Sequence, residues 1–340
     1  MTSENWIGVH TGGAHYLDHL GILCEGLGIP LYVTEPATFK AAREFYPGLK
    51  VEYIDLSDLS LSFLAERADV IFESGHTFAA ELLPLWELLH KKKMRVVYCP
   101  HGNSDKKAPK LRKDLSLIYG EHMRCHLEKT GENALLEKTV ITGNYRAVYD
   151  RVHQKWYDEK LDSFIEKKLV PDRKTVFYAP TWEGPDWFEK TLKVINEIGS
   201  DFNLLLRLHP FLEDLYPAQV EIIKSLTALD LSSFPSIYPI LRRADYYLGD
   251  FSSVGYDFLS LDKPLFFLEP FEGEIYDCGL LLCTNDHYGK TLMEFQDHGQ
   301  LSAKRKELAK KVFGNEKSFE GIKNEIKEAL SFERASWVID

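Results

Sequence analysis

A carboxylate and two hydroxyls stand together where an apolar run ends and a helical pattern begins. Asp250 follows the run YYLG, and Ser252 and Ser253 occupy the expected N-cap and first turn of the helix VGYDFLSL. Serine in that place satisfies free helix amides, but the same hydroxyls and amides also form an anion site that the helix dipole reinforces. Capping explains one serine, whereas the pair together with Asp250 favours a bound phosphate.

Two more expected strands end in groups that suit a phosphate. Thr181 lies in the run YAPTW, and Arg207 and His209 end the run LLLRLHP. Because side chains alternate along a strand, Arg207 and His209 share one face and offer two cationic groups there. The structural alternative for Arg207 is an ion pair with a carboxylate. Together the three strand ends predict a site for a nucleotide diphosphate.

The first half of the chain offers a candidate general base. His101 follows the expected strand RVVYC after one proline, and Gly102 and Asn103 come next. Imidazole titrates near neutral pH and can take a proton from an attacking hydroxyl. The alternative is a histidine that only caps or packs.

A glycine loop follows the first expected strand, WIGVH. Gly12 and Gly13 let backbone N–H groups approach an anion or a substrate, although a plain tight turn explains them equally well. The pattern is not GxGxxG, so it does not indicate a dinucleotide site. His15 and His19 have i, i+4 spacing but no convincing third ligand, and no DxD pair ends a strand. We therefore predict neither a metal nor a cofactor.

The composition is that of a globular protein with an acidic balance. The 340 residues are 44% hydrophobic and carry a net charge of −11, which argues against coating of nucleic acid. Five cysteines form no CxxC pair and are typical of reduced thiols. The start resembles no signal peptide, and no apolar run reaches the roughly 18 residues of a membrane span. These features predict a cytoplasmic protein whose membrane contact is at most peripheral, at the inner face.

Short apolar runs alternate with longer helical patterns, as in parallel α/β proteins. We predict two doubly wound Rossmann-type domains that face each other across a cleft, with ligands at the carboxyl ends of the strands. The expected domains are 1–150, a connecting polar helix at 151–172, 173–315, and a C-terminal helix at 316–340 that crosses back to the first domain. The expected strands lie within 6–10, 29–35, 51–55, 69–75, 95–102, 115–120, 138–146, 174–182, 201–210, 245–250 and 264–269.

At these strand ends the chain resembles the CDP-glycerol glycerophosphotransferase family of teichoic acid synthesis, which is similar in fold to GT-B glycosyltransferases. The resemblance covers about residues 95–290, and its last segment is the most specific. The segments that carry it are PHG (100–102), TGNYR (142–146), YAPTW (178–182), LLLRLHP (204–210) and ADYYLGDFSSVGYDFLSLDKP (244–264).

The resemblance implies transfer of a polyol phosphate, glycerol phosphate first of all, from a CDP-polyol to a hydroxyl acceptor with release of CMP. The acceptor class includes lipid-linked hydroxyls. By the family pattern His101 is the base on the acceptor side, together with Gly12, Gly13, Gly102 and Asn103.

On the donor side, the same pattern makes His209 and the helix end at Ser252 and Ser253 hold the diphosphate, with Thr181, Arg207 and Asp250 beside them. Two alternatives remain open. The first is a sugar-nucleotide enzyme of the same fold, either a glycosyltransferase or a UDP-sugar 2-epimerase. The second is a nucleotide-binding protein without catalytic activity.

Overall fold

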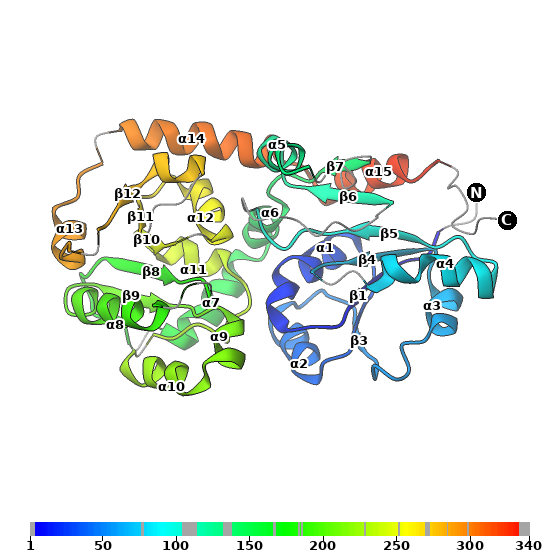
Figure 1. Ribbon diagram of the computed structural model, residues 1–340, viewed down its shortest axis with the longest axis horizontal. Coiled ribbons are helices and arrows are strands. Elements are labelled where there is room, and N and C mark those ends of the chain that lie inside the picture. The colour runs from blue at the N-terminus through cyan, green and yellow to red at the C-terminus, as the bar shows by residue number, and fades with distance from the viewer. Residues whose placement is uncertain are drawn as a thin grey trace. The chain divides into compact units, whose positions relative to one another are not determined.

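The computed structural model describes most of the chain (Figure 1). It divides into two compact units, residues 1–149 with 312–340 and residues 150–311, and each is described by itself. The described residues are 4–75, 78–103, 114–131, 138–165, 168–182, 184, 186–227, 229–250, 252–268, 273–283, 285–297 and 299–332.

The first unit is built on a seven-stranded parallel sheet in the order β3-β2-β1-β4-β5-β6-β7. Its central strands are buried along their whole length, as expected where helices cover both faces of a parallel sheet. After β3 the chain returns to the other side of β1, so the strand order reverses between β1 and β4. The strands are β1 (Trp6–His10), β2 (Leu31–Val33), β3 (Val51–Tyr53), β4 (Val70–Glu73), β5 (Arg95–Tyr98), β6 (Leu115–Ile118) and β7 (Thr139–Ile141).

Helices connect these strands, and the last helix of the chain also belongs to this unit. α15 (Phe319–Ala329) contacts α1 and β7, and a Cβ on Gly26 would lie 2.1 Å from the ring of Phe319 (Figure 1). Lys323 donates to the carbonyl of Leu27 at 2.8 Å, which caps the end of α1. The other helices of this unit are η1 (Ala14–Asp18), α1 (Leu20–Leu27), α2 (Pro36–Phe45), α3 (Leu61–Arg67), α4 (Phe78–His90), α5 (Glu121–Lys129) and α6 (Tyr145–Val152), whose last residues belong to the second unit.

The second unit has a five-stranded parallel sheet in the order β12-β11-β10-β8-β9. The sequence predicted four of these strands, and the prediction missed the two-residue edge strand β12, which is too short to show a hydrophobic pattern. The order reverses between β8 and β10. The strands are β8 (Thr175–Ala179), β9 (Asn203–Leu206), β10 (Tyr246–Gly249), β11 (Leu265–Phe267) and β12 (Leu280–Leu281).

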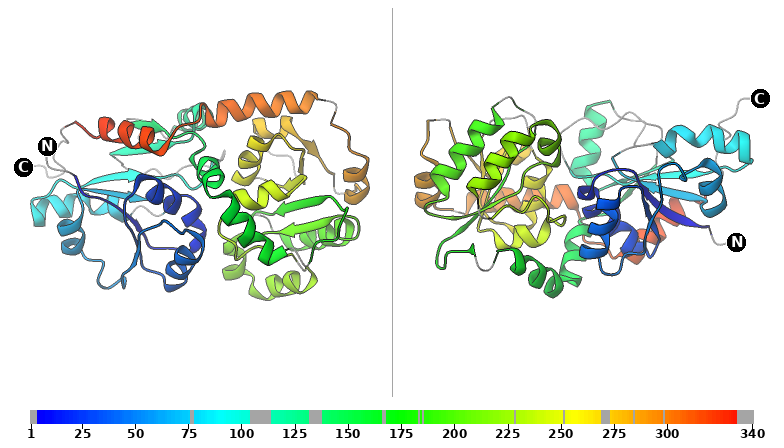
Figure 2. Two further views of the ribbon diagram at one scale, coloured as in Figure 1. Left: turned by 180° about the vertical axis from the view of Figure 1, so that it is seen from behind. Right: turned by 90° about the horizontal axis from the view of Figure 1, so that it is seen from below.

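Helices cover both faces of this sheet (Figure 2), and a large apolar core lies on one of these faces. The core includes Val176, Leu206 and Leu248 from the strands and Val194 and Ile198 from α8. The helices are α7 (Gln154–Ile165), α8 (Trp187–Ile198), α9 (Pro210–Leu215), α10 (Pro217–Leu226), α11 (Tyr238–Arg243), α12 (Ser253–Phe258), η4 (Leu259–Leu261), η5 (Glu274–Cys278), α13 (Tyr288–Glu294) and α14 (Gln300–Phe313), which ends in the first unit.

The prediction of one helix at 151–172 differs in detail from the structure. Two helices, α6 and α7, occupy this region, with a break at His153. The acidic face of α6 and α7 binds α11, because Arg242 donates to Asp150 and to Asp158 at 2.7 Å each. These ion pairs give the charged helix a structural reason for its composition.

Among the described residues, no helix is both long enough and apolar enough to cross a lipid bilayer. The predicted C-terminal helix is present as α15, and residues 333–340 of that segment lie outside the described residues.

Candidate functional site

The predicted phosphate-compatible groups lie on three neighbouring strands of the second unit. β10 pairs with β8 and β8 pairs with β9, so the ends that carry Asp250, Thr181 and Arg207 follow one another along one edge of the sheet. The strand order reverses between β8 and β10, and ligands of open α/β sheets bind at such a reversal.

Asp250, which follows β10, and Thr181, which follows β8, are hydrogen-bonded to each other at this point of the sheet. The carboxylate of Asp250 accepts the backbone N–H of Thr181 at 3.0 and 2.9 Å and its hydroxyl at 3.1 Å. A carboxylate repels a diphosphate, and this one accepts hydrogen bonds from both donors of Thr181. The geometry therefore gives Asp250 a positioning role, in which it fixes the backbone that follows β8.

Ser252 is the N-cap of α12, and its hydroxyl accepts the N–H of Val254 at 3.3 Å. Ser253 is the first helical residue. The backbone approaches the ring of Tyr247 closely here, because a Cβ on Gly249 would lie 2.1 Å from the Tyr247 hydroxyl. Burial, and secondarily the Asp250 carboxylate, raises the pKa of Tyr247, so this hydroxyl stays neutral beside the serines.

Replacing both serines, Ser252→Ala with Ser253→Ala, should weaken CDP binding more than it weakens the fold. Loss of the cap costs about 1 kcal/mol of unfolding free energy, while loss of hydrogen bonds to a charged phosphate costs about 1.5–3 kcal/mol each. Calorimetric titration with CDP and urea denaturation measure the two effects. A folded double variant that binds CDP as tightly as the parent would contradict a phosphate site at these serines.

Arg207 and His209 come after β9, which ends at Leu206. Arg207 donates to the carbonyl of Pro235 at 3.0 Å, which holds the half-buried guanidinium at this edge of the sheet. His209 is the N-cap of α9, and its Nδ1 accepts the N–H of Phe211 at 3.2 Å. While Nδ1 accepts that hydrogen bond it carries no hydrogen, so the neutral ring has its hydrogen on Nε2.

Two aromatic side chains that the sequence did not single out surround His209. The ring of Trp182 lies 6.2 Å from the imidazole and 5.5 Å from the ring of Phe211. Phe211 packs edge-on against His209 at 5.2 Å and is 40% exposed. Trp182 follows Thr181 directly, so these rings belong to the same strand ends as the polar groups.

In the first unit, His101 lies beside a tyrosine that the sequence did not indicate. The ring of Tyr16 lies 5.4 Å from His101, 5.0 Å from His10 and 4.2 Å from His15. Burial raises the pKa of Tyr16, which keeps its hydroxyl neutral. His101, exposed at the end of β5, therefore has an aromatic wall beside it.

Tyr16 reaches His101 over the end of the intervening strand. β4 lies between β1 and β5, and it is followed by Gly75, which has φ +75°. A Cβ at Gly75 would lie 2.4 Å from the ring of Tyr16, so a side chain there would displace the tyrosine.

A buried ion pair fixes the short helix that carries Tyr16. Arg146 of α6 donates through Nε to the carbonyl of Asp18 at 2.9 Å, and its terminal nitrogen pairs with the Asp18 carboxylate. Both side chains are 3% exposed. Arg146 belongs to the TGNYR segment, which was the one sequence signal for this contact.

The remaining predicted groups of the first unit line the same edge of its sheet. The carbonyl of Gly13 accepts a hydrogen bond from His10 at 3.0 Å, and the carbonyl of Gly12 accepts one from Thr38 at 2.8 Å. Both carbonyls are thereby held inside the loop. Asn103 is buried, and its amide lies 3.2 Å from Nδ1 of His122. Gly102 has φ +137°, a conformation that favours glycine.

The histidine pair with helical spacing makes other contacts. His15 packs on Tyr16, and Nδ1 of His19 lies 3.0 Å from the hydroxyl of Tyr119. Over the part of the chain that the structure describes, no group of three or more His, Cys, Asp or Glu side chains could hold a metal ion.

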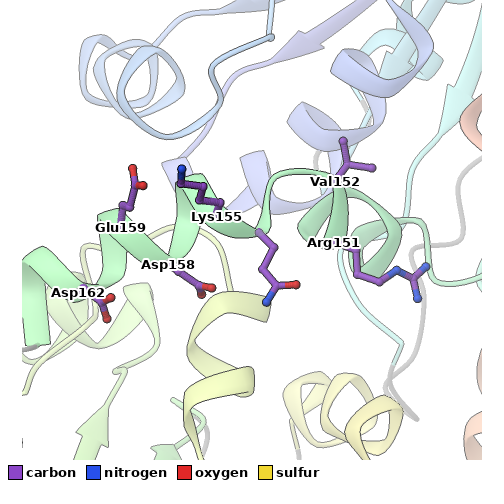
Figure 3. Close-up of a pocket in the computed structure, with 7 residues that line it drawn as sticks. Arg151, Val152, Lys155, Asp158, Glu159 and Asp162 are labelled. Atoms are coloured by element: carbon purple, nitrogen blue, oxygen red, sulfur yellow. The ribbon is translucent and has the colours of Figure 1, made fainter.

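A surface pocket of about 490 Å³ lies on α6 and α7 and includes none of the predicted site residues (Figure 3). Two of its acidic side chains pair with α11, Asp158 with Arg242 and Asp162 with Arg243. The pocket therefore belongs to the ion pairs that hold α11. Its lining residues are Arg151, Val152, Gln154, Lys155, Asp158, Glu159 and Asp162.

Solved structures of known proteins share this fold. The wall teichoic acid polymerase TagF superposes with a TM-score of 0.68 at 18% identity, covering 96% of this chain and 90% of that chain. UDP-GlcNAc 2-epimerase from Neisseria meningitidis gives a TM-score of 0.53 at 15% identity, covering 96% and 99%. The prediction of a GT-B-like α/β fold is confirmed.

Curated relatives match part of the chain. Teichoic acid poly(ribitol-phosphate) polymerase of Bacillus spizizenii is 24% identical over 182 residues, which cover 49% of this chain and 27% of that protein. Teichoic acid poly(glycerol phosphate) polymerase of Bacillus subtilis is 26% identical over 147 residues, 39% of this chain and 19% of that protein. The matched part thus spans less than a third of either relative.

The family match falls on the polar strand ends of the second unit. Residues 136–279 match the family described as CDP-Glycerol:Poly(glycerophosphate) glycerophosphotransferase. This range contains Thr181, Arg207, His209, Asp250 and the two serines of α12. The predicted resemblance to the CDP-glycerol glycerophosphotransferase family is confirmed over this stretch of the chain.

Proposed function

We propose that this chain transfers glycerol phosphate from CDP-glycerol to a hydroxyl acceptor in the synthesis of a cell-surface polymer, with release of CMP. The observation that carries the proposal is the row of phosphate-compatible groups on β8, β9 and β10, all within the family match. Relatives named as polymerases of poly(ribitol-phosphate) and poly(glycerol phosphate) support the reaction class. A structure of TagF obtained after a soak with CDPG supports the donor.

The proposed reaction is a displacement at phosphorus. The acceptor oxygen attacks the phosphorus that carries the glycerol and forms a new P–O bond, and the bond from that phosphorus to the bridging oxygen breaks. CMP leaves with the bridging oxygen and its electron pair, and His101 takes the proton of the acceptor hydroxyl. Arg207, His209 and the serines of α12 offset the charge that builds on the diphosphate.

In this mechanism His209 acts as a neutral hydrogen-bond donor through Nε2. Its Nδ1 is held by the N–H of Phe211, so protonation there would break the cap of α9. A fixed tautomer presents one N–H to a phosphate oxygen without any proton transfer.

Two substitutions of His209 separate its role as the N-cap of α9, through Nδ1, from its proposed role as a hydrogen-bond donor to phosphate, through Nε2. His209→Asn keeps an oxygen near the position of Nδ1, so the fold should stay intact while CDP affinity falls about tenfold to a hundredfold. His209→Gln places an amide N–H nearer the position of Nε2 and should recover part of that affinity at a cost of about 1 kcal/mol in unfolding free energy. Calorimetry with CDP and urea denaturation give both numbers. Equal CDP affinity in His209→Asn and the parent would reduce His209 to a cap.

A UDP-sugar enzyme is the second candidate, because the epimerase shares the fold. The two candidates differ in the nucleotide that the site holds. We expect calorimetric titration to give clearly tighter binding of CDP than of UDP, whereas a preference for UDP would favour the sugar-nucleotide candidate. Binding of CDP without any turnover would support a nucleotide-binding protein that lacks catalysis.

A further inference from the structure

Tyr119 reaches the residue that stands directly before His101. Tyr119 follows β6 and Pro100 follows β5, and these two parallel strands are paired, so both residues lie at the carboxyl edge of the sheet. The hydroxyl of Tyr119 donates to the carbonyl of Pro100 at 3.3 Å. The thiol of Cys99 lies 3.7 Å from the same carbonyl, but a thiol is a weak donor. Tyr119 therefore gives this carbonyl its stronger hydrogen bond.

The carbonyl of Pro100 sets the direction in which the chain leaves β5. The proline ring fixes φ, so ψ is the backbone rotation left within Pro100, and ψ turns the carbonyl. Because a peptide unit is planar, a hydrogen bond to that carbonyl also fixes the peptide that joins Pro100 to His101. Gly102 follows with φ +137°, and glycine restrains the backbone least. The hydrogen bond from Tyr119 thus restrains His101 on the side that no glycine loosens.

His19 orients the hydroxyl of Tyr119. Its Nδ1 lies 3.0 Å from the hydroxyl oxygen. The one hydroxyl hydrogen of Tyr119 points to Pro100, so the oxygen accepts from His19, and Nδ1 carries a hydrogen. The backbone N–H of His19 donates to the carbonyl of Tyr16 at 3.0 Å. His19 is therefore joined both to the tyrosine beside His101 and to the peptide before it.

These hydrogen bonds lie away from solvent. Tyr119 is 1% exposed, His19 is 9% exposed, and Pro100 is buried. The ring of Tyr119 stacks on the ring of Tyr145, with centroids 5.9 Å apart and an interplanar angle of 4°. Hydrogen bonds between buried groups are strong because water does not compete for the donor and the acceptor. The backbone before His101 is therefore held in one conformation.

We propose that Tyr119 and His19 are positioning residues for His101. Tyr119 acts on the peptide before His101, and His19 acts through Tyr119. Together they keep the imidazole in the orientation in which it takes the proton of the acceptor hydroxyl. A displacement of about 1 Å at a reacting group can cost about 100-fold in rate. The inference rests on the proposed role of His101 as the base, and its test therefore includes a measurement that needs no activity.

The first test is Tyr119→Phe, which removes the hydroxyl and keeps the stacked ring. We expect kcat for CMP release from CDP-glycerol to fall by about tenfold or more. CDP affinity in calorimetry should stay within about twofold, because the donor groups lie on β8, β9 and β10 of the other unit.

The matched control is Tyr145→Phe. The hydroxyl of Tyr145 donates to the carbonyl of His19 at 3.3 Å instead of to Pro100, and Tyr145 is as deeply buried as Tyr119. Each variant loses one buried hydroxyl, so the midpoint of urea denaturation should shift by a similar amount in both. Only Tyr119→Phe should lose turnover, while Tyr145→Phe should stay within about twofold of the parent kcat.

Two substitutions of His19 test the second residue. His19→Asn places an amide nitrogen near the position of Nδ1, so it can still donate to Tyr119, whereas His19→Leu cannot. We expect His19→Leu to lower kcat about tenfold and His19→Asn to recover most of that loss. Equal kcat values in the two variants would contradict the role of His19.

The measurement that needs no activity is the NMR signal of the Cε1–H group of His101 in the full chain with isotope-labelled histidine. Its absence from His101→Ala assigns the signal. The ring of Tyr16 lies 5.4 Å from the imidazole, so its ring current shifts this signal. We expect Tyr119→Phe to move the signal toward that of an unstructured peptide and Tyr145→Phe to leave it in place.

The outcomes separate this inference from the proposed function. An unmoved His101 signal in Tyr119→Phe would overturn the inference whether or not the chain is active. A moved signal with the parent kcat would also overturn it, because the reaction would then not depend on the position of His101. A parent chain that releases no CMP would instead contradict the proposed function, and the NMR comparison would still decide whether Tyr119 positions His101.

Discussion

Replacing His101 with alanine is expected to lower the turnover number for CMP release by about 10²–10⁴-fold. The proposed base would be lost, and the acceptor hydroxyl would have to give its proton to water. Because the donor groups lie on β8, β9 and β10 of the other unit, CDP affinity should stay within about twofold, so that kcat falls and donor binding does not. Steady-state CMP release and calorimetry with CDP measure the two quantities.

The matched control is His126→Ala, a histidine of α5 outside the proposed machinery. It should keep the parent turnover number. An unchanged turnover number in His101→Ala would remove His101 from the mechanism and leave it as the exposed histidine that packs on Tyr16.

Replacing Arg146 with alanine is expected to cost about 3–5 kcal/mol of unfolding free energy, because it leaves the Asp18 carboxylate buried without its cation. Both side chains are 3% exposed, so water cannot take the place of the guanidinium. Urea denaturation of the full chain, monitored by tryptophan fluorescence and circular dichroism, measures the loss of unfolding free energy. Asp18 is the last residue of the short helix η1, which contains Tyr16. Loss of the ion pair should therefore also loosen the position of the Tyr16 ring beside His101.

Arg124→Ala is the control for that experiment. Arg124 pairs with Glu121 and Glu128 on the surface of α5, where the three side chains are 39–48% exposed. Exposed pairs contribute about 0–1 kcal/mol, so this variant should denature nearly like the parent. Equal losses in the two variants would mean that the Arg146 ion pair contributes no more than a surface pair.

The strands were predictable from the sequence because most of them are buried on both faces. Runs such as VIF and YYLG carry no charged residue and lie between loops, and the structure places β4 and β10 on them. The edge strand β12 has two exposed leucines and no such signal. Polar residues at strand ends were equally visible, since any polar group that follows an apolar run stands out.

The contacts between those groups were not predictable, because they depend on which strands are neighbours. The hydrogen bond between Thr181 and Asp250 joins residues 69 positions apart in the sequence, and it forms only because β10 pairs with β8. The contact between Tyr16 and His101 requires β4 to lie between their strands and Gly75 to leave room for the ring. The spacing of residues along the chain indicates neither the pairing of β10 with β8 nor the position of β4 between β1 and β5.

The most direct test of the proposed function is the identity of the nucleotide that the purified chain releases. CDP-glycerol, CDP-ribitol and UDP-GlcNAc are each supplied with glycerol 3-phosphate as the hydroxyl acceptor, and the products are separated by mass. We predict CMP from CDP-glycerol, with a product heavier than the acceptor by one glycerol phosphate unit, and no nucleotide from UDP-GlcNAc. Release of UDP from UDP-GlcNAc, or tight CDP binding with no CMP from either CDP-polyol, would contradict it.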